Sequence, residues 1–107
     1  MKLSVIIPTH NRSEILKTTL QKILEQEGVE FEVIVVDDGS TDDTHEVAKL
    51  MSNPMGARNN VPILYIHQEA THQGVARNRG VEVATGEIIV FIGDDIFVEP
   101  GFLEQHL

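Results

Sequence analysis

Two pairs of neighbouring aspartates are the residues whose types and spacing best suit chemistry in this sequence. Asp37-Asp38 follows an apolar, β-branched run directly, and Asp94-Asp95 follows another after a single glycine. Carboxylates suit Mg²⁺ or Mn²⁺, which bridge phosphate oxygens and keep several bound waters. Adjacent side chains at a strand end point to opposite faces, so one acid of Asp94-Asp95 can bind a metal while the other contacts a sugar hydroxyl or a metal-bound water. For an isolated Asp-Asp pair, simple capping of the following turn is an equally weighted interpretation.

The segment after the first aspartate pair combines ligand-binding and capping features. An acid that follows the second strand of a nucleotide-binding fold commonly accepts hydrogen bonds from a ribose or a base. Gly39 permits a positive φ and a close approach of the backbone to a ligand. We therefore expect Asp38 to contact a ligand, and Asp42 and Asp43 to cap the next helix and complement its dipole.

Other polar residues carry weaker signals. Arg77 and Arg79 fall in the early turns of an expected helix whose N-terminus near Gly74 could face an anion, although a solvated arginine is the commoner case. The histidines lack metal-binding spacing of the HExxH kind and are expected at the surface or in loops. Of these, His10 and His72 fall on loops at the end of the sheet where the acids lie.

Strand and helix patterns alternate along the whole chain. Apolar, β-branched runs predict strands over residues 3–7, 31–36, 63–67 and 87–92. Helical periodicity predicts helices from Ser13 as N-cap to Gly28, from Ser40 or Thr41 to about residue 51, over 73–85, and from residue 100 onwards. The turn-rich residues 52–60 predict a surface loop.

Individual positions carry further expectations. Pro8 is expected to stop the first strand and Gly86 to cap the 73–85 helix. The expected buried stripes of the first two helices comprise Ile15, Leu16, Leu20, Ile23 and Leu24, and Val47, Leu50 and Met51.

The alternation predicts an α/β fold, with a Rossmann-like, mostly parallel sheet and helices on both faces. Ligands of such sheets bind outside the carboxyl ends of the strands. Both aspartate pairs follow strand ends, so we expect them to meet across one crevice.

Composition narrows the function. A length of 107 residues suits one domain, and a net charge of −9 argues against nucleic acid as a partner. The absence of cysteine excludes disulfides and cysteine-based zinc sites, and fits a cytoplasmic protein. The longest purely apolar run, Ile88–Ile92, is too short to span a membrane. No GxGxxG, P-loop or GxSxG motif occurs, which argues against nicotinamide, P-loop and hydrolase sites.

Four motifs in order resemble family 2 glycosyltransferases with the GT-A fold. They are VIIPTHNR (5–12), VVDDGSTD (35–42), GVARNRG (74–80) and ATGEIIVFIGDD (84–95). The resemblance implies that Thr9 and Asp38 hold the nucleotide base and ribose, with Asp37 alongside. It also implies that Pro8 closes the first strand next to the nucleotide and that Arg77 lies near the donor.

The last motif bears on the metal. Asp95 is similar to the second acid of the family's DxD motif, which binds the metal directly, and Asp94 to an acid that contacts the ribose or supports the metal. Gly93 stands where many members carry the first Asp, which leaves the division of roles between Asp94 and Asp95 open.

The resemblance implies a sugar transfer from a nucleotide-diphosphate donor, with a UDP-sugar favoured, to a hydroxyl of a glycan, lipid or other acceptor. It implies assistance by Mg²⁺ or Mn²⁺ and an inverting outcome. We expect residues 1–107 to be the donor-binding portion, with the catalytic base beyond Leu107, and a location in the cytoplasm or at the inner membrane face through a longer parent chain. A non-catalytic nucleotide-binding module is the alternative. A receiver-like phosphoacceptor ranks last, because Pro8-Thr9 stands where its acids belong.

Overall fold

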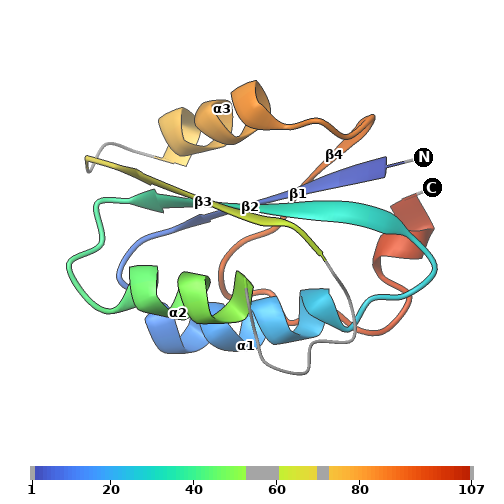
Figure 1. Cartoon of the computed structure of the whole chain (residues 1–107), viewed down its shortest axis with the longest axis horizontal. Helices are drawn as coiled ribbons and strands as arrows, with labels where there is room; N and C mark the ends of the chain where they lie inside the picture. The colour runs from blue at the N-terminus through green and yellow to red at the C-terminus, as the bar shows by residue number, and fades with distance from the viewer. Residues whose placement is uncertain (1, 53–60, 70–72, 107) are drawn as a thin grey trace.

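The computed structural model describes residues 2–52, 61–69 and 73–106, and its centre is a parallel sheet. The four strands lie in the order β3-β2-β1-β4, and every neighbouring pair is parallel. Figure 1 shows α1 and α2 against one face of the sheet and α3 against the other. The elements are β1 (Lys2–Thr9), α1 (Ser13–Leu24), β2 (Glu30–Asp38), α2 (Thr44–Ser52), β3 (Ile63–Gln68), α3 (Gln73–Val83), β4 (Ile88–Phe91) and a short 3₁₀ helix, η1 (Leu103–His106). The α/β prediction with helices on both faces is confirmed.

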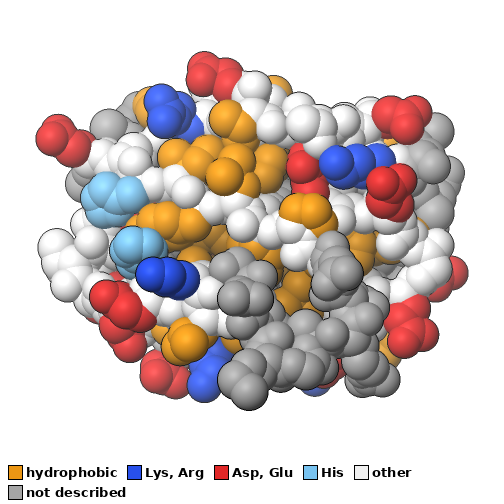
Figure 2. Space-filling model, in the orientation of Figure 1, with side chains coloured by type: hydrophobic (Ala, Val, Ile, Leu, Met, Phe, Trp, Pro, Cys, Tyr) orange, Lys and Arg blue, Asp and Glu red, His pale blue; other side chains and the backbone are white. Residues whose placement is uncertain are grey.

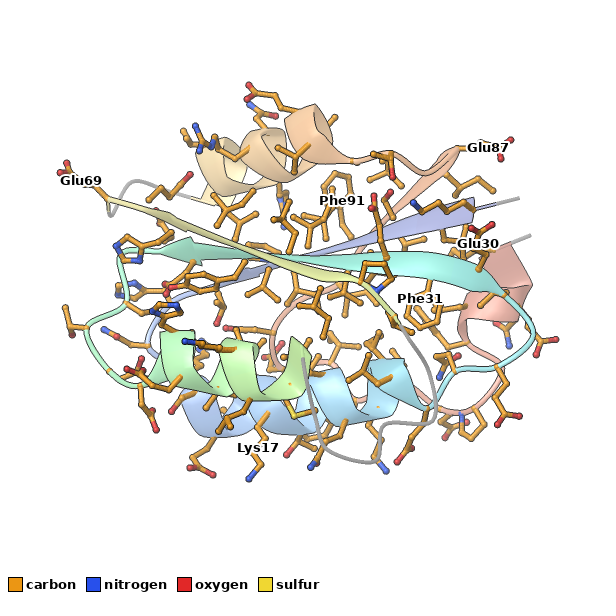
Figure 3. The ribbon with its side chains drawn as sticks, viewed as in Figure 1. Lys17, Glu30, Phe31, Glu69, Glu87 and Phe91 are labelled. Carbon is orange, nitrogen blue, oxygen red and sulfur yellow. The ribbon has the colours of Figure 1, made fainter. Side chains whose placement is uncertain are left out.

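The central strands are apolar on both faces because helices cover both sides. Toward α1 and α2, the strands bury a large cluster that includes Leu3, Val5, Phe31 and Val33. Toward α3 they bury a smaller one formed by Ile6, Ile34 and Val36. Figure 3 shows Phe31 on the α1 side of the sheet and Phe91 on the α3 side.

Pro8 does not stop the first strand, as was predicted, because it lies inside β1 and pairs with Val36 of β2. The backbone carbonyl of Ile6 accepts a hydrogen bond from the N–H of Ile92, so the backbone polar groups of Ile6 point toward β4. Backbone groups two residues apart in a strand point the same way, so the nitrogen of Pro8 also points toward the β4 side, but the pairing of β1 with β4 ends at Ile6 and Phe91. The missing N–H of Pro8 therefore falls where β4 no longer needs a donor, which is where a strand tolerates proline.

The predicted start of α1 is wrong by one residue. Ser13 is the first helical residue, Arg12 precedes it, and no side chain of α1 caps the end. Instead, the carboxylate of Asp42 accepts the Ser13 N–H from 3.4 Å. The cap comes from a loop that is distant in sequence, which local spacing does not reveal.

Two helical stripe predictions are also wrong. Ile15 is 40% exposed and Leu50 is 71% exposed, whereas Leu16, Leu20 and Ile23 are fully buried. The sheet covers a narrower arc of each helix than the apolar residues span.

Gly86 is not the C-cap of α3, which ends at Val83. Gly86 lies in the turn before β4, and its N–H donates to the Ser4 hydroxyl at 2.7 Å. A Cβ at this position would lie 2.7 Å from the backbone nitrogen of Ser4. Glycine is required here for the close approach of this turn to β1.

Within the described part of the chain, no helix combines the length and the apolar character that crossing a membrane requires. Most of the predicted loop over 52–60 and His72 lie outside the described residues.

Candidate nucleotide-binding and metal site

The carboxyl ends of the strands form one edge of the molecule. Thr9 of β1 is in register with Asp37 of β2, and Asp37 is in register with His67 of β3. This edge lies at the left in Figure 1, and Figure 2 shows histidine side chains exposed there. The loops that follow β1, β2 and β4 leave the sheet at this edge and carry the candidate residues.

Asp94 is held from two directions and points inward. Its Oδ2 accepts the Thr9 hydroxyl at 2.9 Å, and its backbone carbonyl accepts the Thr19 hydroxyl at 2.7 Å. The residue is 8% exposed. Residues of β1 and α1 therefore both hold Asp94 in place, and it is the buried member of the pair.

Asp95 points outward, but strand alternation is not the reason, because β4 ends at Phe91 and both acids lie in the turn that follows. Its side chain is 56% exposed and contacts the guanidinium of Arg12, with Nη1 3.5 Å from Oδ2. The same Nη1 lies 3.4 Å from Oδ1 of Asp94. The Gly93 carbonyl accepts the Ile96 N–H at 3.2 Å, so both acids lie in one tight turn whose carboxylates share a single cation.

Asp37 is a buried anchor. It is 1% exposed, and its Oδ1 accepts the N–H of Ser40 at 2.9 Å. Its Oδ2 accepts the hydroxyl of Tyr65 and lies 3.6 Å from Nδ1 of His67. Burial and the carboxylate of Asp37 raise the pKa of Tyr65, so Tyr65 remains a hydrogen-bond donor. These contacts use both carboxylate oxygens to shape the loop after β2.

Asp38 is more accessible than Asp37 and is the last residue of β2, at the edge where the strands end. Its Oδ1 accepts from the side-chain amide of Gln68 at 3.0 Å, and its backbone carbonyl lies 2.6 Å from Nδ1 of His10. His10 is exposed. Asp38 and His10 therefore stand together on the β2 side of Thr9, and Asp94 stands on the β4 side.

Asn11 joins the loops after β1 and β2. Its backbone is in the left-handed region at φ 49°. Its Oδ1 accepts the N–H groups of Thr41 at 2.7 Å and Asp42 at 3.3 Å, and its own N–H donates to the Ser40 hydroxyl at 2.8 Å. Sequence reasoning gave Asn11 no role, although it belongs to the first motif and asparagine is among the residues that tolerate this backbone region.

Arg12 and Thr19 were also missed. Thr19 carried a usable signal, since it is a polar residue three positions after Leu16 on the buried face of α1. Arg12 carried none beyond its place in the first motif, because an arginine beside a helix start is usually solvated.

Asp42 caps a helix, as predicted. Its Oδ1 accepts the N–H of Thr44 at 3.0 Å and also the Thr44 hydroxyl. Partial burial raises the pKa of Asp42, but the hydrogen bonds from Thr44 and Ser13 outweigh that effect and lower it.

Arg77 and Arg79 are exposed on α3, across the sheet from α1 and α2 (Figure 1). No hydrogen bond or ion pair among the described residues connects Arg77 to Asp94 or Asp95. A donor-binding role for Arg77 stays a prediction.

The two carboxylates of Asp94 and Asp95 suit a hard divalent cation whose remaining ligands are water and phosphate oxygens. Asp94 and Asp95 offer carboxylate oxygens and already attract the positive guanidinium of Arg12. Among the described residues, no group of three or more histidines and acids is arranged to hold a metal. Mg²⁺ and Mn²⁺ sites of this kind use one or two carboxylates and complete the shell with phosphate oxygens and water.

Comparisons with known proteins identify the family. The sequence model described as Glycosyl transferase family 2 matches residues 4–107. YibD of Escherichia coli K12, an uncharacterized glycosyltransferase, is 39% identical over 103 residues, which are 96% of this chain and 28% of YibD.

Solved structures agree with this assignment. TarS 1–349 of S. aureus in complex with UDP-GlcNAc matches with a TM-score of 0.84 and 31% identity, over 99% of this chain and 30% of that one. The mannosyltransferase PcManGT of Pyrobaculum calidifontis, in complex with GDP-Man and Mn²⁺, matches with a TM-score of 0.78 and 29% identity, over 87% of this chain and 27% of that one. The chain thus spans less than a third of the length of these proteins. It belongs to glycosyl transferase family 2.

Proposed function

We propose that this chain binds the donor of a glycosyltransferase, a nucleotide-diphosphate sugar, with a UDP-sugar as the favoured donor. The observation that carries the proposal is the position of Thr9 between two acid-bearing loops. On one side it is in register with Asp37, which precedes Asp38, and on the other side its hydroxyl holds Asp94. A nucleoside diphosphate has two ends that match these two loops: the base and ribose at one end and the diphosphate at the other.

We assign the nucleoside to the β2 side. Asp38 accepts hydrogen bonds from the ribose or base, Thr9 borders the same position, and Pro8 fixes the end of β1 beneath it. Asp37 acts indirectly, because its oxygens already hold Ser40 and Tyr65. UDP-GlcNAc is the ligand of the TarS complex and GDP-Man that of the PcManGT complex, which supports a sugar nucleotide as ligand class.

We assign the diphosphate to the β4 side, with Asp95 as the direct ligand of Mg²⁺ or Mn²⁺. Asp94 is less available because Thr9 and Thr19 hold it in place, so it positions the turn and contacts the ribose or a metal-bound water. When bound, the metal neutralises charge that develops on the departing diphosphate. The PcManGT complex contains Mn²⁺.

We propose that the reaction is an inverting transfer. An acceptor hydroxyl of a glycan, lipid or other molecule attacks the anomeric carbon from the face opposite the diphosphate. The bond between the anomeric carbon and the diphosphate oxygen breaks, and a base takes the proton of the hydroxyl. We assign this base outside Met1–Leu107, in the part of the relatives' length that this chain does not span.

Calorimetric titration of UDP in the presence of Mn²⁺ tests the proposal. We expect saturable binding to the wild-type chain, loss of the Mn²⁺-dependent part in Asp95→Ala, and loss of most of the binding in Asp38→Ala. Glu30→Ala is the matched control, because it removes one exposed acid at the opposite end of β2 (Figure 3) and should leave binding unchanged. Equal UDP affinity in wild type and Asp95→Ala would remove Asp95 from the metal role. Absence of UDP binding at millimolar concentrations in wild type would refute the donor site.

A further inference from the structure

The guanidinium of Arg12 supplies the positive charge beside the carboxylates of Asp94 and Asp95. Its Nη1 lies 3.4 Å from Oδ1 of Asp94 and 3.5 Å from Oδ2 of Asp95. Asp94 has other partners in Thr9 and Thr19, but the ion pair that the structure gives the Asp95 side chain, among the described residues, is with Arg12. Without Arg12, two neighbouring carboxylates in one turn would repel each other with no compensating charge.

A divalent cation on Asp95 competes with Arg12 for the same oxygen. Both are positive, and two cations about 4 Å apart repel strongly near a protein surface. A guanidinium does not lose its charge at any physiological pH, so it can leave the metal position only by moving.

The side chain of Arg12 can move without opening the site. Its backbone is held on both sides, because Asn11 is tied to the loop after β2 and the Arg12 carbonyl accepts the Leu16 N–H at 2.8 Å as the first bond of α1. The side chain itself is half exposed. Rotation of a long, solvated side chain is thus sufficient to vacate the carboxylates.

From this geometry we propose that Arg12 is a resident counter-ion that holds Asp95 beside Asp94 in the metal-free protein and is displaced when the divalent cation binds. Arg12 thereby sets the metal concentration at which the site fills. This inference rests on the proposed donor site. It adds a positioning residue that lowers apparent metal affinity while it keeps the empty site in order.

Electron paramagnetic resonance titration with Mn²⁺, with and without UDP, measures free and bound metal directly. We expect Arg12→Gln to bind Mn²⁺ more tightly than wild type by about two- to fivefold, the range that an exposed ion pair supports. Arg12→Lys keeps the charge and should stay close to wild type. Thermal unfolding of the metal-free chains should show Arg12→Gln folded but slightly less stable, with a larger stabilisation by Mn²⁺ than in wild type.

The outcomes separate the two proposals. Mn²⁺ binding that depends on Asp95 but is unchanged or weakened in Arg12→Gln overturns the role of Arg12 and leaves the donor site standing; weakening would place Arg12 on the diphosphate instead. No Mn²⁺ binding in either chain, with or without UDP, overturns both. Binding that appears in Arg12→Gln and is weaker in wild type supports the displacement.

Discussion

Substitution of Asn11 tests how much one residue contributes to the shape of the loop after β2. Asn11 has φ 49°, and its side chain accepts two backbone N–H groups of the loop after β2. Asn11→Gly removes both hydrogen bonds and tolerates the backbone conformation. Because the position is exposed and water replaces part of what is lost, we expect a loss of about 0.5–1.5 kcal/mol in the free energy of unfolding.

Asn11→Ala removes the same bonds and adds backbone strain. A residue with a Cβ in the left-handed region costs roughly 1–2 kcal/mol, and the greater freedom of glycine in the unfolded chain offsets about 0.4–1 kcal/mol of the difference. We therefore expect Asn11→Ala to be less stable than Asn11→Gly by about 0.5–1 kcal/mol, a few degrees in Tm for a domain of this size.

Asn11→Asp keeps an oxygen that can accept from Thr41 and Asp42, and should stay closest to wild type. Urea unfolding followed by circular dichroism gives the order of the variants, and UDP titration should show weaker binding in the same order. If Asn11→Ala were as stable as Asn11→Gly, the strain argument would fail. If Asn11→Asp were as unstable as Asn11→Ala, the acceptor argument would fail.

Two further predictions concern Tyr65, which contacts Asp37, and Gly80, which packs against β1. Tyr65 is the single tyrosine and no tryptophan is present, so near-ultraviolet tyrosinate absorbance reports Tyr65 alone. Because its pKa is raised in the folded state, the stability it provides is complete below the unfolded value of about 10 and is lost as pH rises above it. Ionisation should begin only well above pH 10, and earlier in Asp37→Asn; ionisation near pH 10 in the folded wild type would contradict the buried contact. Gly80→Ala would place a Cβ 2.5 Å from Cγ2 of Ile6, whose branched side chain cannot easily turn away, so thermal unfolding should show a loss of about 1–3 kcal/mol from overpacking. A gain in stability instead, as helix propensity alone predicts, would mean that α3 is not pressed against β1, and a smaller loss in an Ile6→Ala background would support the contact.

The sequence by itself determined the layers of this fold and the end of the sheet where the site lies. Apolar runs such as residues 31–36 and 87–92 and the helical spacing between them are local signals, and parallel strands place all their carboxyl ends at one edge. For the same reason both aspartate pairs could be assigned to that edge. Alternation of side chains predicted opposite directions for Asp94 and Asp95, but that rule holds within strands, and β4 ends at Phe91, before the two acids.

Only the tertiary structure decided which residues each acid contacts and how far it is buried. Asp37 and Asp38 are neighbours in sequence, but the first is buried and accepts the hydroxyl of Tyr65 from β3, whereas the second is partly exposed and accepts from Gln68. Asp94 is fixed by Thr9 and Thr19, which lie 85 and 75 residues away in sequence. Such contacts depend on how strands and helices pack. A hydrogen bond or an ion pair between residues distant in sequence produces no periodic pattern from which it could be predicted.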